Sequence, residues 1–264
     1  MAEEVFMALK MPALFIGHGN PMNAIMNNSY TAALKEAAKS IPRPKAILVV
    51  SAHWMAQGTH ITCADRPRQI YDFYGFPDEL YQVKYSPSGA EGFVALIEEE
   101  LREEGVTCSD KWGMDHAAWA VLVHMYPNAD IPVVEMSLDM GRDEEYHYNM
   151  GKKLRGLRDK GILVIGSGNI VHNLWKMNRE MDAAPFAWTI DFDSYIARAL
   201  ENNDHRALID YKNAGDSAKL AVPTRDHYLP LLYIAGMQEE GDTLEFIHTG
   251  LQHSSMSMRC IRIG

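Results

Sequence analysis

The sequence predicts an α/β fold, because short apolar runs typical of strands alternate with longer segments of helical periodicity along the chain. The length agrees, since 264 residues lie within what one α/β domain can hold. No internal repeat, low-complexity tract or dividing linker is found. We therefore expect a single domain over residues 1–264, with a mixed, mostly parallel central sheet flanked by helices.

The expected elements follow from the apolar periodicity, taken in chain order. Strands are expected at residues 13–16, 46–52, 131–137, 161–166, 243–248 and 256–263. Helices are expected at residues 30–39, 89–104, 117–125, 143–159, 188–200 and 227–236. Within the second helix, Phe93, Ile97 and Leu101 share one face, and the opposite face is acidic and solvated. Gly105 then ends that helix.

The last two expected strands differ from the others in their connection. Only the short segment 250–255 joins them, which suits an antiparallel pair, whereas the earlier strands alternate with helices and should run parallel. The sheet should therefore be mixed.

Charge and apolar content exclude two kinds of partner. The net charge of −10 argues against nucleic acid and against an anionic membrane, since both require a basic face. The first ten residues, MAEEVFMALK, contain two acids and no long apolar stretch, and no apolar run approaches the ~20 residues that span a bilayer. We expect a cytoplasmic protein.

The three cysteines, Cys63, Cys108 and Cys260, are odd in number, far apart and without CxxC spacing. This pattern predicts neither a disulfide framework nor a thiolate zinc site. We expect each of them to pack as a small buried apolar side chain in a reducing compartment.

Four histidines follow apolar runs or turns in well-separated stretches of the chain. They are His18 in LFIGHGNPM, His53 in AILVVSAHW, His172 in ILVIGSGNIVHN and His227 in PTRDHYLPLL. An open α/β sheet presents groups to a crevice at its strand ends, so side chains at several such ends can converge. The set therefore predicts a metal site at the strand ends, although any one of these histidines alone would be an ordinary core or loop residue.

Six sequence blocks carry a resemblance to a known family. The blocks are GHGNPM at 17–22, VVSAHW at 49–54, DFYGFP at 72–77, WGMDHAAW at 112–119, GSGNIVHN at 166–173 and DHYLPLLY at 226–233. In this order and spacing the chain resembles the 4,5-DOPA extradiol dioxygenases, a group of the LigB-like class III ring-cleaving dioxygenases. The resemblance runs from about residue 11 to the C-terminus. It implies an enzyme that inserts both atoms of O₂ into a catechol ring, with a DOPA-like substrate, to give a ring-opened semialdehyde.

The resemblance also implies a set of metal ligands. His18 and His53 supply two imidazoles, and the segment around His227 supplies the third ligand, where the wider superfamily has a carboxylate. Asp226 is the alternative third ligand, and its residue type and position also suit an N-terminal cap on the helix that follows. Three facial ligands leave open positions for a catechol and O₂ on a non-heme iron(II).

The identity of the metal depends on the charge of its ligands. Three neutral imidazoles leave the full +2 charge on the ion and suit Zn²⁺ as well as Fe²⁺. We expect Zn²⁺ in the isolated protein and Fe²⁺ as the ion that supports turnover.

Two further histidines, His172 and His116, are expected near the metal. By the resemblance, His172 is the base that takes a catechol proton, a role that suits an imidazole, and it could instead become a fourth ligand of a zinc ion. His116 resembles a pocket histidine near substrate or O₂, and a structural residue paired with Asp115 is the alternative. The turn expected at 166–169 would let the backbone approach the site.

Aromatic side chains surround these motifs. Trp54, Trp112 and Trp119 could form walls of an aromatic pocket, although core packing suits at least two of them. By the resemblance, the loop 71–76 lies over the cleft, and Tyr74 in it could contribute to substrate choice.

Two other functions remain open on the sequence alone. A zinc hydrolase would use the same histidines to activate water, but no HExxH supplies its general base. A non-catalytic metal-binding protein would need only the fold. The sequence leaves open the oligomeric state, the native metal and the physiological catechol.

Overall fold

The computed structural model describes residues 10–264, and a central sheet of eight strands organises them. The strands follow the order β4-β3-β5-β2-β6-β1-β10-β7. Their bounds are β1 Ala13–Gly17, β2 Ala46–Ala56, β3 His60–Thr62, β4 Thr107–Ser109, β5 Val133–Asp139, β6 Ile162–Gly168, β7 Leu244–His248 and β10 Cys260–Ile263. A separate pair joins β8 Leu251–Gln252 to β9 Met256–Ser257.

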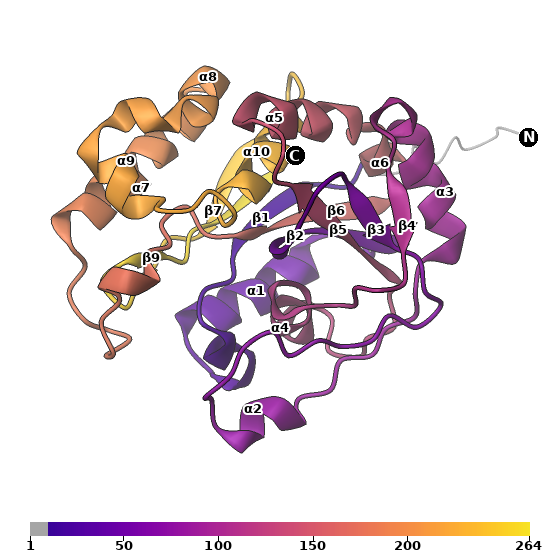
Figure 1. Cartoon of the computed structure of the whole chain (residues 1–264), viewed down its shortest axis with the longest axis horizontal. Coiled ribbons are helices and arrows are strands. Elements are labelled where there is room, and N and C mark those ends of the chain that lie inside the picture. The colour runs from indigo at the N-terminus through magenta and orange to yellow at the C-terminus, as the bar shows by residue number, and fades with distance from the viewer. Residues whose placement is uncertain (1–9) are drawn as a thin grey trace, which may run out of the picture.

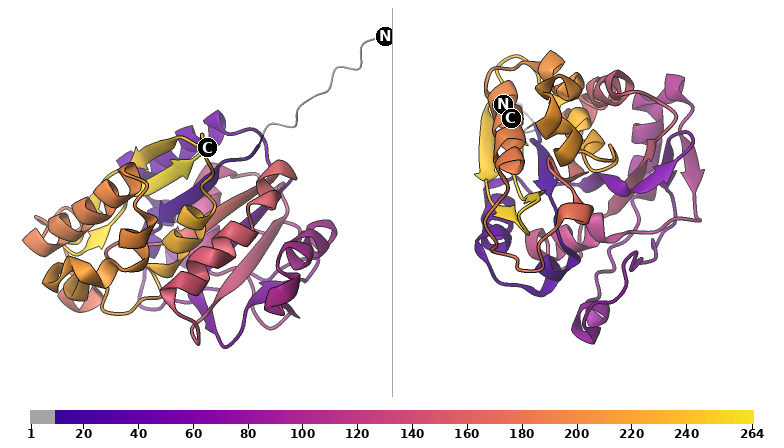
Figure 2. Two further views of the ribbon diagram at one scale, coloured as in Figure 1. Left: turned by 90° about the horizontal axis from the view of Figure 1, so that it is seen from above. Right: turned by 60° about the vertical axis from the view of Figure 1, so that its left-hand side comes forward.

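The centre of the sheet is parallel, as expected. The four strands β5, β2, β6 and β1 pair in parallel, and β3 pairs in parallel with β4. The C-terminal strands β7 and β10 form the expected antiparallel pair, and β10 adds to β1 in an antiparallel direction. Figure 2 shows these yellow strands beside the indigo first strand. The prediction of a mixed, mostly parallel α/β fold is confirmed.

Helices cover both faces of the sheet (Figure 1). On one face lie α1 Ser29–Ser40 and α4 His116–Met125, packed on side chains such as Leu14, Ile47 and Ile165. The other face is covered by α3 Glu91–Glu100, α5 Glu144–Lys153, α6 Gly156–Asp159, α7 Ala187–Glu201, α8 His205–Ile209, α9 Asp216–Ala221 and α10 Leu229–Gly236. Successive strand residues face opposite sides, so the two clusters share the same strands. The short helix α2, Asp78–Gln82, follows the loop 71–77.

Several expected elements differ from the structure. The strands β3 and β4 were not predicted, because three residues each are too few for a periodic signal. The expected helix 143–159 is divided into α5 and α6, and the expected strand 256–263 is divided into β9 and β10. Residues 166–168 belong to strand β6 rather than to a turn.

The prediction for the cysteines is wrong for two of the three. Cys63 and Cys108 form a disulfide, with their Cα atoms 5.6 Å apart. The reason is the unpredicted pairing of β3 with β4, which brings Cys63, directly after β3, close to Cys108 in β4, 45 positions away in the chain. Cys260 is free and buried, as expected. Residues 1–9 of the N-terminal segment lie outside the described part, and no described helix has the length and apolarity needed to cross a membrane.

Candidate metal centre and active site

The candidate site lies where the parallel strands β1, β2 and β6 end. His18 directly follows β1, and His172 lies four residues after β6. His53 lies within β2, because this strand continues to Ala56 rather than ending at 52. The pairing of β2 with β5 shifts between Val50 and Met55, so His53 belongs to an irregular stretch of the strand.

His227 reaches the same place from the segment before α10. The backbone carbonyl of His227 accepts a hydrogen bond of 2.8 Å from the Asn169 amide, just past β6. Gly168 permits this contact, since a Cβ atom there would lie 2.1 Å from the His227 carbonyl oxygen. The expected backbone approach at 166–169 therefore occurs, although strand residues provide most of it.

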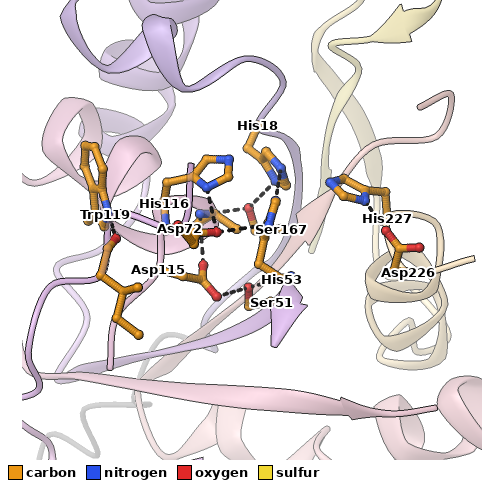
Figure 3. Close-up of polar contacts among 12 residues, drawn as sticks. His18, Ser51, His53, Asp72, Asp115, His116, Trp119, Ser167, Asp226 and His227 are labelled. Atoms are coloured by element: carbon orange, nitrogen blue, oxygen red, sulfur yellow. Dashed lines mark hydrogen bonds and ion pairs between the residues drawn. The ribbon is translucent and has the colours of Figure 1, made fainter. Parts of the chain in front are cut away.

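Three of the predicted ligands come together. The rings of His18, His53 and His227 face a common space (Figure 3), and one nitrogen of each lies within 4.8 Å of the other two. Nε2 of His18 lies 3.2 Å from Nε2 of His53. Nε2 of His227 is buried and has no hydrogen-bond partner, which is costly for a polar atom unless another ligand satisfies it. This donor set fits a metal ion.

The other ring nitrogen of each histidine is held by the protein. Ser167 donates its hydroxyl proton to the Ala117 carbonyl, so its oxygen accepts from Nδ1 of His18, 3.1 Å away. The carboxylates of Asp72 and Asp226 accept from Nδ1 of His53 and His227. In its neutral form each of the three rings therefore carries its proton on Nδ1 and presents an unprotonated Nε2, which is the usual arrangement around protein-bound metals.

Burial keeps most of these rings neutral, as metal ligation requires. Burial and the neighbouring imidazoles lower the pKa of His18 well below its usual value. Burial also lowers the pKa of His227 to about 4. His53 differs, because the hydrogen bond to Asp72 and the nearby carboxylates outweigh burial and raise its pKa.

The role expected of Asp226 as a helix cap is wrong. Helix α10 begins at Leu229, two residues later than expected, and no side chain caps it. Asp226 instead hydrogen-bonds the His227 ring, which directs its carboxylate at that ring rather than into the shared space of the three Nε2 atoms (Figure 3).

Asp72 joins two histidines and was not predicted as a site residue. Its Oδ2 lies 3.0 Å from Nδ1 of His53 and 2.9 Å from Nδ1 of His116. Its Oδ1 also accepts from the His116 amide, 3.0 Å away. Burial alone would raise the pKa of this carboxyl, but the two imidazole hydrogen bonds hold it well below its usual range. These three side chains could also hold a metal, but their facing atoms already satisfy one another.

His116 begins helix α4 and is not paired with the Asp115 side chain. Asp115 is the cap of that helix, and its carboxylate accepts from the Ala117 amide. It also accepts from the Ser51 hydroxyl, 2.7 Å away, and Ser51 in turn accepts from the His53 amide. Asp115 thus supports the backbone at His53, while Asp72 orients the His116 ring.

His172 lies beside the three clustered histidines rather than among them. Its ring stacks on the His227 ring, with centroids 3.5 Å apart and planes within 7°. Within residues 10–264, His172 belongs to neither group of mutually close metal-binding atoms. Burial and the neighbouring His227 lower its pKa well below the usual value, so the ring is neutral and able to accept a proton.

A cavity of about 280 Å³ opens above these histidines. His18, His53, His116, His172 and His227 all line it. None of the tryptophans 54, 112 and 119 is among its lining residues, and Trp119 is fully buried in the core. The aromatic walls come instead from Phe73 and Phe76 of the loop expected over the cleft.

Comparisons with known proteins identify the family of this chain. Residues 12–262 match the family described as the catalytic LigB subunit of aromatic ring-opening dioxygenase. A relative from Escherichia coli K12 named 4,5-DOPA dioxygenase extradiol is 39% identical over 98% of this chain and 97% of its own length. A relative of the same name from Beta vulgaris is 37% identical, with 92% of each chain covered.

A solved structure gives the same result at the level of the fold. The crystal structure of an uncharacterized Escherichia coli K12 protein superposes with a TM-score of 0.84 and 36% identity, covering 97% of this chain and all of that one. Family, relatives and fold therefore agree over nearly the whole sequence. The chain belongs to the LigB family of extradiol, aromatic ring-opening dioxygenases.

Proposed function

We propose that the protein opens the ring of a catechol with O₂, using a metal held by His18, His53 and His227. The observation that supports this most is the shared orientation of the three rings, whose Nδ1 atoms are all occupied by protein acceptors. A metal ion would give the buried, unpartnered Nε2 of His227 its missing partner.

Fe²⁺ is the proposed active metal and Zn²⁺ the proposed metal of the isolated protein. Fe²⁺ at this site would supply the one-electron chemistry between catechol and O₂ that Zn²⁺, which has no accessible redox change, does not supply. His18, His53 and His227 would hold this ion.

His172 is the proposed base. It lines the cavity next to His227 and is neutral, so it can take a proton from a catechol hydroxyl as the substrate binds. Because its ring lies outside the group of three ligand atoms, we favour this role over a fourth ligand.

His116 is proposed to accept a hydrogen bond from the substrate. Its Nδ1 donates to Asp72, so its Nε2 carries a lone pair. Since His116 lines the cavity, that lone pair can orient a hydroxyl of the bound catechol. Asp72 acts as a positioning residue for both His116 and the metal ligand His53.

The proposal is tested by measuring metal content and activity together. His53→Ala should lose stoichiometric metal, because one of three ligands is removed. The iron-loaded parent protein should consume O₂ and form a yellow semialdehyde from catechols. Stoichiometric metal in His53→Ala would refute the ligand set, and an iron-loaded protein inactive on every catechol would favour a non-catalytic binding protein.

A further inference from the structure

Apart from its histidines, Asp72 and Asn20, the cavity is lined by apolar side chains and Gly19. Four segments of the chain contribute apolar side chains to it, which are Pro21, Phe73, Phe76, Leu174, Met177 and Met256. Within residues 10–264, no lysine or arginine lines the cavity. Its one carboxylate, Asp72, is already engaged by two imidazoles. The cavity therefore offers an apolar surface, rather than an ion-pair partner, to a substituent on the aromatic ring of the substrate.

Exposed apolar side chains lie on the same two segments of the chain as lining residues of the cavity. Leu174 is 55% exposed and Trp175 is 77% exposed, and both precede Met177 in the segment that follows His172. On the loop that supplies Phe73 and Phe76, Tyr74 is 92% exposed. Exposed large apolar side chains near a cavity are a feature of ligand-binding surfaces.

The segment that carries these side chains is held in place at several points. The turn between β8 and β9 accepts backbone hydrogen bonds from Asn173, Asn178 and Phe186, at 3.2, 2.9 and 3.1 Å. His172 itself bridges to Met256 of β9, and Figure 1 shows β9 beside this segment. Leu174 and Trp175 are therefore exposed on an anchored backbone.

We propose that the substrate is a catechol whose ring carries an uncharged, apolar substituent, and that Leu174, Trp175 and Met177 bind this substituent. The inference rests on the proposed function, because the catechol ring must lie at the histidines. Burying methylene groups against this wall is favourable, whereas burying an ammonium or a carboxylate without a partner is costly. The alternative partner for a carboxylate is Lys176, which is exposed and lies between Trp175 and Met177 in the chain.

The test compares a homologous series on the iron-loaded protein. We expect kcat/KM to rise about three- to fourfold for each methylene from 4-methylcatechol to 4-butylcatechol, until the wall is covered. DOPA and 3,4-dihydroxyphenylpropionate should be at least about tenfold poorer than 4-propylcatechol. Binding to the zinc-loaded protein, followed by tryptophan fluorescence, should give the same order without turnover.

Variants locate the effect. Leu174→Asn and Met177→Gln should flatten the dependence on chain length, and Trp175→Ser should weaken binding of the longest substituent. Ile190→Gln is the matched control, since Ile190 is exposed on α7 but does not line the cavity. In this control variant, kcat/KM should depend on the length of the alkyl chain as it does in the parent protein.

The outcomes separate this inference from the proposed function. If every catechol is cleaved but kcat/KM does not depend on the length of the alkyl chain, the apolar-substituent inference is wrong and the function stands. The same holds if DOPA is preferred and Lys176→Met abolishes that preference. If no catechol is cleaved, the function itself fails. An apolar rim that serves a protein or membrane partner would also give a flat series.

Discussion

The carboxylate of Asp226 accepts a hydrogen bond from Nδ1 of its chain neighbour His227, and Nε2 of the same ring lies buried without a partner. Burial would raise the pKa of Asp226, yet His227 holds it well below the usual range, so the carboxylate stays charged. A charged acceptor fixes the ring and increases the basicity of the nitrogen that faces the metal.

Asp226→Asn should therefore weaken zinc binding by about 10- to 100-fold, the usual effect of losing such a partner. Competition with a chelating indicator measures this affinity. Asp216→Asn is the control, because Asp216 is exposed and pairs only with Lys219 among the described residues. Equal zinc affinity in the two variants would mean that Asp226 does not support the ligand.

His172→Ala should keep its metal and lose turnover by about a hundredfold or more, because a proton acceptor is removed while the three proposed ligands remain. Metal analysis and steady-state kinetics on the same preparation are both needed. Loss of the metal would instead identify His172 as a ligand.

The isolated protein should contain zinc and show little oxygenase activity. Three neutral nitrogen donors bind Zn²⁺ more tightly than Fe²⁺ in the usual affinity order. Elemental analysis followed by O₂ uptake with a catechol, before and after anaerobic iron loading, tests this. O₂ uptake by the zinc form at the rate of the iron form would contradict the redox role given to iron.

Stability should fall as the pH is lowered from about 6.5 to about 4, and His147 should contribute to this fall. Burial lowers the pKa of His147 in the folded protein to about 4, and its Nε2 has no partner. Between these pH values the unfolded chain takes up a proton that the folded protein does not. This lowers the free energy of unfolding by on the order of 3 kcal/mol. Urea unfolding of metal-free protein should show a shallower pH dependence for His147→Leu. If the unfolding free energy of His147→Leu varied with pH as steeply as that of the parent protein, His147 would not contribute.

The sequence predicted that His18, His53 and His227 come together, because each belongs to a motif near the end of a strong strand pattern or the start of a helix. Asp72 was assigned only to a loop over the cleft, since its two partners lie 19 and 44 residues away in the chain and no local spacing joins them. The same limit applies to the Cys63–Cys108 disulfide, because the paired strands β3 and β4 that bring these cysteines together are three residues long. For Asp226, the residue type suggested a cap, but the helix begins two residues later than expected and the carboxylate lies beside an imidazole.

Gly168 has no functional group, yet the position of His227 depends on it, because the His227 carbonyl occupies the place of a side chain. Any larger residue would push the segment before α10 away from the sheet and carry an imidazole with it. A saturation mutagenesis screen for activity should therefore rank position 168 with the histidines, although this residue can neither bind a metal nor transfer a proton. In such a screen, intolerance to change would report on the space between two backbones rather than on chemistry.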